Sequence, residues 1–167
     1  APSAKASFRA TVDVPARSRL DAARAEHERI RRRMIALQEE LDWHVYGLYG
    51  LTDEPLAYGD ADLPGLDLGQ RAFEIALARR VADGDESTAW FERHGSTPIT
   101  EIPESWPAEY RELVQRRLDL MASDRSIGLL ERPEFKRRWA AKSWEEMEAE
   151  ALRDYCLDRL EDPSWWS

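Results

Sequence analysis

The sequence predicts an all-α fold in which a long amphipathic, coiled-coil-like helix is followed by a compact multi-helix domain. Alanine and leucine number 22 and 18, whereas the strand-favouring valine, isoleucine and threonine together number only 16. Apolar residues also recur at helical intervals along most of the chain. With 167 residues, 43% hydrophobic and 34% charged, the composition fits one globular domain with an attached arm.

Residues 1–17 open with the small polar run APSAKAS and predict a flexible tail. The alternation of Phe8, Ala10, Val12 and Val14 favours one short strand within it, ended by Pro15. Because the first residue is alanine and not methionine, we expect a fragment or a processed chain.

Residues 18–46 predict the long helix, with Ser18 as a favourable N-cap. The apolar spacing then alternates between three and four for four heptads, which is typical of a coiled-coil seam. The seam positions are Leu20, Ala23, His27, Ile30, Met34, Leu37, Leu41, His44 and Leu48. We expect this seam to be buried, either on the later helices or on a second copy in a homodimer. Replacing Leu37 with Asp should then destabilise the fold or dissociate the dimer by about 2–4 kcal/mol.

Residues 47–69 hold seven of the seventeen glycines and prolines together with several acids, and predict an acidic linker. Residues 70–167 predict a helical carboxy-terminal domain. Its helices are expected near residues 70–83, 86–94, 106–121, 134–141 and 144–162, the last starting at a capping box formed by Ser143 and Glu146. Trp139 and Trp144 are expected to share one buried pocket.

The charge is unevenly distributed along the chain. The net charge is −9, but residues 1–40 carry nine basic and six acidic side chains, whereas residues 41–167 carry fifteen and twenty-seven. An acidic body repels phosphate and a basic arm attracts it. Arg31, Arg32 and Arg33 are therefore the candidate DNA-contacting residues. The second candidate cluster consists of Lys136, Arg137 and Arg138.

Few residues are placed for catalysis or metal binding. Cys156 falls in an amphipathic helix and is expected to be a buried thiol, while His27 and His44 are expected to pack on the seam or face a partner. Adjacent acids such as Glu39 and Glu40 are expected on a solvated face. The chain has no phosphate loop, no Gly-rich dinucleotide turn, no HExxH and no asparagine. We expect no catalytic, cofactor-binding or metal-binding residue, and no membrane-spanning segment.

His94 is predicted to end a short helix, where a cation suits the helix dipole. The following residues complete the run His-Gly-Ser-Thr-Pro at 94–98. A helix C-cap and turn is the first interpretation of this run, and a small anion-binding nest is the second.

Three stretches of the sequence resemble a known family. The first is GQRAFEIALARRVADGDESTAWFERHGSTPITEIPESWP from residue 69, and the second is LLERPEFKRRWAAKSWEEMEAEALRDYCLDRLED at 129–162. Both are similar to the carboxy-terminal part of PglX, the adenine-specific DNA methyltransferase family of phage growth limitation and type 2 BREX systems. Residues 38–54, QEELDWHVYGLYGLTDE, resemble a helix-ending signature that follows target-recognition regions in large DNA methyltransferases. The resemblance covers about residues 18–162.

The resemblance implies a cytoplasmic parent enzyme that transfers a methyl group from S-adenosylmethionine to adenine in DNA during bacterial defence against phage. None of that family's catalytic motifs has a counterpart in this chain. We therefore expect a non-catalytic accessory domain that packs on other domains of the parent methyltransferase, contacts DNA or docks other defence-system proteins. A protein-interaction adaptor with no nucleic-acid role is the alternative. A small hydrolase or nuclease built from carboxylates on separate helices is a third reading.

Overall fold

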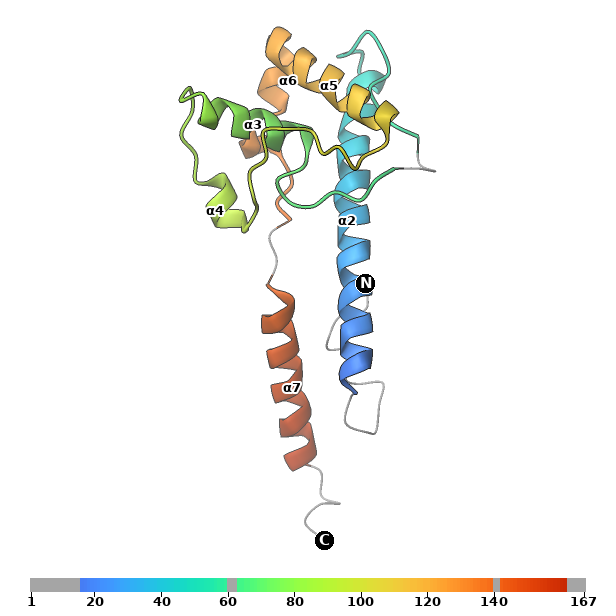
Figure 1. Ribbon diagram of the computed structural model, residues 1–167, viewed down its shortest axis with the longest axis vertical. Helices are drawn as coiled ribbons and strands as arrows, with labels where there is room; N and C mark the ends of the chain where they lie inside the picture. Colours follow the sequence, from blue (N-terminus) through green and yellow to red (C-terminus); the bar gives the residue numbers. More distant parts are fainter. Residues whose placement is uncertain (1–15, 60–62, 140–141, 162–167) are drawn as a thin grey trace. The chain divides into compact units, whose positions relative to one another are not determined.

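The computed structural model describes residues 16–59, 63–139 and 142–161, and the regular structure in these residues is entirely helical. The predicted all-α, multi-helix class is thereby confirmed, whereas the strand and tail predicted at the amino terminus lie outside the described residues. None of the described helices combines the length and the hydropathy that a membrane-spanning segment needs. The elements, drawn in Figure 1, are α2 (Arg17–Leu48), α3 (Ala72–Ala82), α4 (Trp90–His94), α5 (Ala108–Ser123), α6 (Arg125–Leu130), the 3-10 helix η1 (Pro133–Phe135) and α7 (Trp144–Leu160).

Two compact units share the long helix α2. Unit 1 comprises residues 1–31 and 141–167, and unit 2 comprises residues 32–140. The units divide after Arg31 and after Ala140, whereas the sequence suggests boundaries at residues 46 and 69. The reason is that the two halves of α2 each bury side chains in a separate apolar cluster.

In unit 1 the first half of α2 packs against α7. The apolar contact is small and consists of Leu20, Trp144 and Ala151, surrounded by Ala23, Met147 and Tyr155. The ring of His27 lies 5.6 Å from that of Trp144 between centroids. The first three seam positions of α2 are therefore packed within the chain, as the heptad spacing predicts.

Polar contacts add to the pairing of these two helices. Arg17 lies 2.5 Å from Glu148 and Arg24 lies 2.8 Å from Glu145, measured between side-chain nitrogen and oxygen. Arg17, Arg24 and Glu145 are each more than two-fifths exposed and only Glu148, at 12%, is mostly covered, so each pair contributes about 1 kcal/mol or less. Ser143 begins α7 with the predicted capping box, in which its hydroxyl oxygen accepts from a backbone N–H of the first turn.

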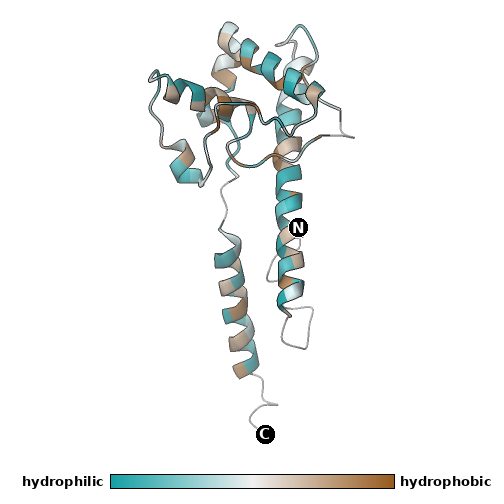
Figure 2. Cartoon of the chain, viewed as in Figure 1, coloured by the Kyte–Doolittle hydropathy of each residue, from teal (hydrophilic) through white to brown (hydrophobic). Residues whose placement is uncertain are grey.

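The second half of α2 buries a different face from the predicted seam. Met34, Leu37, Leu41 and Leu48 are 44%, 43%, 54% and 72% exposed. The buried positions are instead Ile35, Ala36, Glu39, Glu40, Trp43 and Tyr46. From Met34 onward the seam is therefore not buried on the later helices of this chain, and that alternative is wrong. Burial on a second copy, and with it the predicted cost of Leu37→Asp, is not tested. The expected homodimer stays a prediction. In Figure 2, hydrophilic and hydrophobic residues follow one another along both α2 and α7.

Aromatic burial explains why the other face is chosen. Trp43 is fully buried and its ring meets that of Tyr46 edge-to-face at 5.4 Å between centroids. A buried tryptophan removes more apolar area from water than a leucine does, so two aromatic rings outweigh the heptad pattern. The exposed seam residues remain as an apolar stripe on α2, defined here as Met34, Leu37, Leu41 and Leu48.

The main core of unit 2 joins α2 to α3, α5, α6 and the segments between them. Residues 47–69 contribute Leu56, Leu63 and Leu66, which are at most 7% exposed. The described residues of this stretch that follow Leu48 form no helix or strand, but the backbone N–H of Leu66 donates to the carbonyl of Arg32 on α2. The acidic Gly/Pro-rich stretch is thus packed into the core.

Residues 134–141 are expected from the sequence to be helical, but the described residues among them form only the single turn η1 before the chain becomes extended at Lys136. The extended backbone lets the Lys136 side chain enter the core and lets the carbonyl of Arg137 accept from Arg71 at 2.8 Å.

Trp139 packs against the core of unit 2, whereas Trp144 belongs to the cluster of unit 1. The prediction that these two rings share a pocket is therefore wrong.

A buried guanidinium connects α5 to α2. Arg117 is 0% exposed and donates to both carboxylate oxygens of Glu40, at 3.0 and 2.6 Å. It also donates to the carbonyl of Leu56 at 2.9 and 2.6 Å, and it lies 3.7 Å from Glu39. The expectation of a solvated face for Glu39 and Glu40 is wrong, because Arg117 supplies the charge that allows both carboxylates to be buried.

Replacing Arg117 with Met should lower the free energy of unfolding by about 3–5 kcal/mol, because it leaves buried carboxylates without a partner. Arg116→Met is the matched control, since the neighbouring Arg116 pairs with Glu54 at 3.0 Å on the surface. That exposed pair should be worth about 1 kcal/mol or less. Urea denaturation of both variants measures the difference, and equal losses would contradict the role given to Arg117.

Candidate functional site

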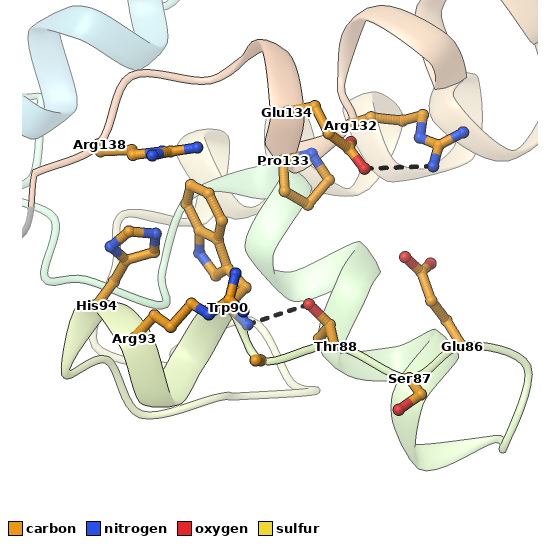
Figure 3. Close-up of a pocket in the computed structure, with 11 residues that line it drawn as sticks. Glu86, Ser87, Thr88, Trp90, Arg93, His94, Arg132, Pro133, Glu134 and Arg138 are labelled. Carbon is orange, nitrogen blue, oxygen red and sulfur yellow. Dashed lines mark hydrogen bonds and ion pairs between the residues drawn. The ribbon is translucent and has the colours of Figure 1, made fainter.

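A pocket of about 340 Å³ opens in unit 2 between α4 and the segment that contains η1. Figure 3 shows Trp90, Arg93 and His94 on α4 and, facing them, Pro133 and Arg138 from the other wall. The remaining lining residues are Glu86, Ser87, Thr88, Ala89, Arg132 and Glu134. Three arginines from two separate segments therefore line one cavity.

The α4 wall is positioned by apolar packing behind it. Trp90 and Phe91 are buried with Phe73, Leu77 and Ala78 of α3. The indole N–H of Trp90 donates to Glu74 at 3.0 Å, and its backbone N–H donates to the Thr88 hydroxyl oxygen at 3.1 Å. Gly95 then ends the helix at a φ of 57°, a left-handed conformation that favours glycine. These contacts hold Arg93 and His94 beside the cavity.

The opposite wall is tied to α3 through Arg71. This arginine forms a buried ion pair with Glu74 at 3.0 Å and donates to the carbonyl of Arg137 at 2.8 Å. The second bond fixes the backbone immediately before Arg138. As a result, the buried guanidinium of Arg71 sets the position of the pocket wall that carries the exposed Arg138.

The balance of charge in the pocket is positive. Among the residues that the structure describes, neither Arg93 nor Arg138 has a carboxylate within ion-pair distance. Glu86 lines the pocket but is already paired at 2.7 Å with Arg80, which is not a lining residue. The remaining lining acid, Glu134, meets Arg132 at 3.4 Å. This contact is longer than a strong charge-assisted hydrogen bond.

His94 responds to this charge. Burial lowers the pKa of the His94 imidazole below its ordinary value of 6.5, and the positive charge of Arg138 lowers it further. The imidazole is therefore neutral at neutral pH and does not act there as the cation expected at the end of the helix. Its Nδ1 atom is buried and has no hydrogen-bond partner. The ring of Trp90 lies edge-on at 4.2 Å between centroids.

The three arginines of the first predicted DNA cluster are divided between the units. Arg31 ends the amino-terminal part of unit 1, whereas Arg32 and Arg33 begin unit 2. Arg32 pairs with Asp67 at 2.7 Å, and Arg33 donates to the carbonyl of Leu63 at 3.2 Å. The structure thus directs Arg32 and Arg33 to the segment that follows α2. Their contact with DNA stays a prediction.

Lys136 of the second cluster is not placed for contact with a phosphate. It is 7% exposed, and its ammonium donates to Glu131, to Asp42 at 3.0 Å and to the Tyr46 hydroxyl at 3.1 Å. Although burial lowers the pKa of Lys136, the carboxylates of Glu131, Glu39 and Asp42 raise it above its ordinary value, so the ammonium stays charged. Its neighbours differ: Arg137 lies 4.5 Å from the Trp139 ring, and Arg138 lines the pocket.

Other candidate residues are placed as follows. Cys156 is exposed, so its predicted burial is wrong. This follows from the narrow apolar face of α7, in which Trp144 and Ala151 are the buried positions. His44 is exposed, and His27 is half-buried against Trp144. No group of three or more metal-ligating side chains occurs in the described part of the chain.

Together the fold and the pocket define a small helical domain with a cationic cavity. The chain belongs to the DUF7008 family, a domain of unknown function, which matches residues 34–167. Over 157 residues it is 55% identical to the adenine-specific methyltransferase PglX of Streptomyces coelicolor, and the resemblance to PglX is thereby confirmed. The match covers 92% of this chain but only 13% of that relative. No solved structure matches the chain.

The residues that line this pocket do not fit the methyl donor that such enzymes generally use. S-adenosylmethionine carries a sulfonium cation, which Arg93, Arg132 and Arg138 would repel from the pocket. The described residues also lack the strand and Gly-rich turn that commonly hold an adenosine cofactor. No step of methyl transfer is therefore assigned to this chain.

Replacing Arg138 with Gln should raise the pKa of His94, because one of the charges that oppose protonation is removed. Burial remains, so the pKa should rise only part of the way toward 6.5. An NMR titration of the imidazole measures the change. Arg116→Gln, which removes an equal charge elsewhere in unit 2, should leave the titration of His94 in place; an identical shift in both variants would refute the local effect.

Proposed function

We propose that the chain is a non-catalytic helical accessory domain of an adenine-specific DNA methyltransferase in bacterial phage defence. The observation that carries this proposal is the 55% identity over 92% of the chain to a relative of which only 13% is matched. A match of this kind supports a domain of a longer protein. In this proposal, transfer of a methyl group from S-adenosylmethionine to DNA adenine belongs to other domains of the cytoplasmic parent. The defence setting, BREX or phage growth limitation, is that of the PglX family.

The apolar stripe on α2 supports a docking role within that parent. Its residues follow one another at helical spacing on one side of the helix, and each is more than two-fifths exposed. An exposed apolar face of this kind marks an interaction surface. Because most of the matched relative lies outside this chain, we infer that the stripe packs against another domain of the same longer protein.

A protein-interaction adaptor is the second candidate function. The net charge of −9 favours it, since an acidic chain is repelled by DNA phosphates. In that case the stripe would bind a separate defence protein, and loss of the chain would leave DNA methylation by the parent unchanged. The two candidates therefore differ in whether the chain supports methylation.

The isolated chain should transfer no methyl group. It is to be incubated with labelled S-adenosylmethionine and duplex DNA, beside full-length PglX of Streptomyces coelicolor as the positive control. PglX lacking its matched segment should lose most of its activity and regain part of it when the chain is added. Clear adenine methylation by the chain alone would refute the non-catalytic proposal. Full activity of the shortened PglX would favour the adaptor.

Changing both Leu37 and Leu41 to Asp should weaken binding of the chain to the shortened PglX at least about tenfold, since charge would enter an apolar contact. The free energy of unfolding should change by about 1 kcal/mol or less, because both side chains are exposed. Leu129→Asp is the control, as Leu129 is 52% exposed on α6 and lies off the stripe. Equal weakening by the control, or normal binding by the double variant, would argue against docking through α2.

A further inference from the structure

We propose that the pocket between α4 and the η1 segment binds a phosphate group carried on a nucleotide, either a free nucleotide or a residue of a nucleic-acid strand. The proposal is independent of the methyltransferase assignment, because it rests on the chemistry of the pocket lining. No role in the preceding sections uses this cavity.

The cations of the pocket suit a phosphate better than a single carboxylate. Arg93, Arg132 and Arg138 each present a planar fork of N–H donors, which matches the oxygens of a phosphate in a bidentate manner. Arg93 and Arg138 have no carboxylate partner among the described residues, so their donors are available to a ligand. Arg132 holds Glu134 at 3.4 Å, a contact that a closer anion can replace.

Neutral donors lie beside these cations. The Thr88 hydroxyl oxygen accepts a hydrogen bond from the Trp90 backbone, which leaves the hydroxyl hydrogen for a ligand oxygen. Ser87 adds a second hydroxyl to the lining. The Nδ1 atom of His94 is buried without a partner, and a neutral imidazole can either donate or accept at that atom.

The shape and the apolar part of the wall favour a ligand larger than inorganic phosphate. A volume of about 340 Å³ lies near the lower end of the range for small-molecule pockets. Trp90 and Pro133 form an apolar part of the lining, as Figure 3 shows, and can contact a sugar or a flat base. A bare phosphate would use the arginines and leave this part of the pocket unfilled.

The local charge also differs from that of the whole chain. The chain carries a net charge of −9, yet the pocket gathers three arginines against two acids, one of which is neutralised by Arg80. A cationic cavity on an acidic chain attracts a small anion at short range, while the remaining surface repels extended DNA. This contrast predicts binding to one or a few nucleotides and weak binding to long duplexes.

The test uses the full chain and three probes: inorganic phosphate, adenosine monophosphate and a short single-stranded DNA. Isothermal titration at low and at physiological salt should show the monophosphate or the strand binding more tightly than inorganic phosphate. The pKa of His94, followed by NMR, should rise when the probe binds, because the added negative charge favours the imidazolium.

Three double variants separate the pocket from general charge. Arg93→Gln with Arg138→Gln should weaken binding at least about tenfold, and Arg93→Lys with Arg138→Lys should give an intermediate loss, since charge is kept but the fork is lost. Arg116→Gln with Arg125→Gln removes the same charge elsewhere in unit 2 and should leave binding within about twofold. Thermal melting confirms that each variant is folded.

The outcomes decide both the site and the source of the phosphate. Binding of the monophosphate alone indicates a free nucleotide, and tighter binding of the strand indicates nucleic acid. No binding by any probe, or equal loss in both Gln double variants, would overturn the proposal. Failure here would leave the accessory-domain proposal intact, because methylation by PglX and docking through α2 are measured separately.

Discussion

The packing of unit 2 depends on the need to satisfy the buried guanidinium of Arg117. Its charge is balanced by Glu39 and Glu40 on α2, and those carboxylates also accept from the backbone N–H groups of Ala72, at the start of α3, and Tyr58. Each bond ties a different part of the chain to the same face of α2. Because an unpaired charge in an apolar interior is very costly, only one rotation of α2 satisfies all of these groups.

Local sequence signals predicted the helices well and their buried faces less well. The helix periodicity and the Ser143 capping box depend on residues close together in the chain, so they can be read from the sequence. The partner of Glu40 lies 77 residues away, and the partners of Lys136 include Asp42, 94 residues away. No local pattern distinguishes such acids from solvated ones. The heptad seam likewise gave no sign that Trp43 would take the interior.

Local sequence patterns could not predict the pocket either. Its two walls come from segments that the sequence marked for separate reasons: His94 for a possible anion-binding nest, and Arg138 as part of a basic cluster. Their convergence depends on the bond from Arg71 to the Arg137 carbonyl, which no spacing rule predicts.

The exposed thiol of Cys156 has a practical consequence for the study of assembly. The sequence contains one cysteine, so oxidation of the isolated chain in air can join two copies through a single disulfide. Such a covalent pair would have the same mass as a dimer formed through α2. Only a reducing agent separates the two in a sizing experiment. The same thiol provides one defined position on α7 for a fluorescent or spin label, without any substitution in the chain.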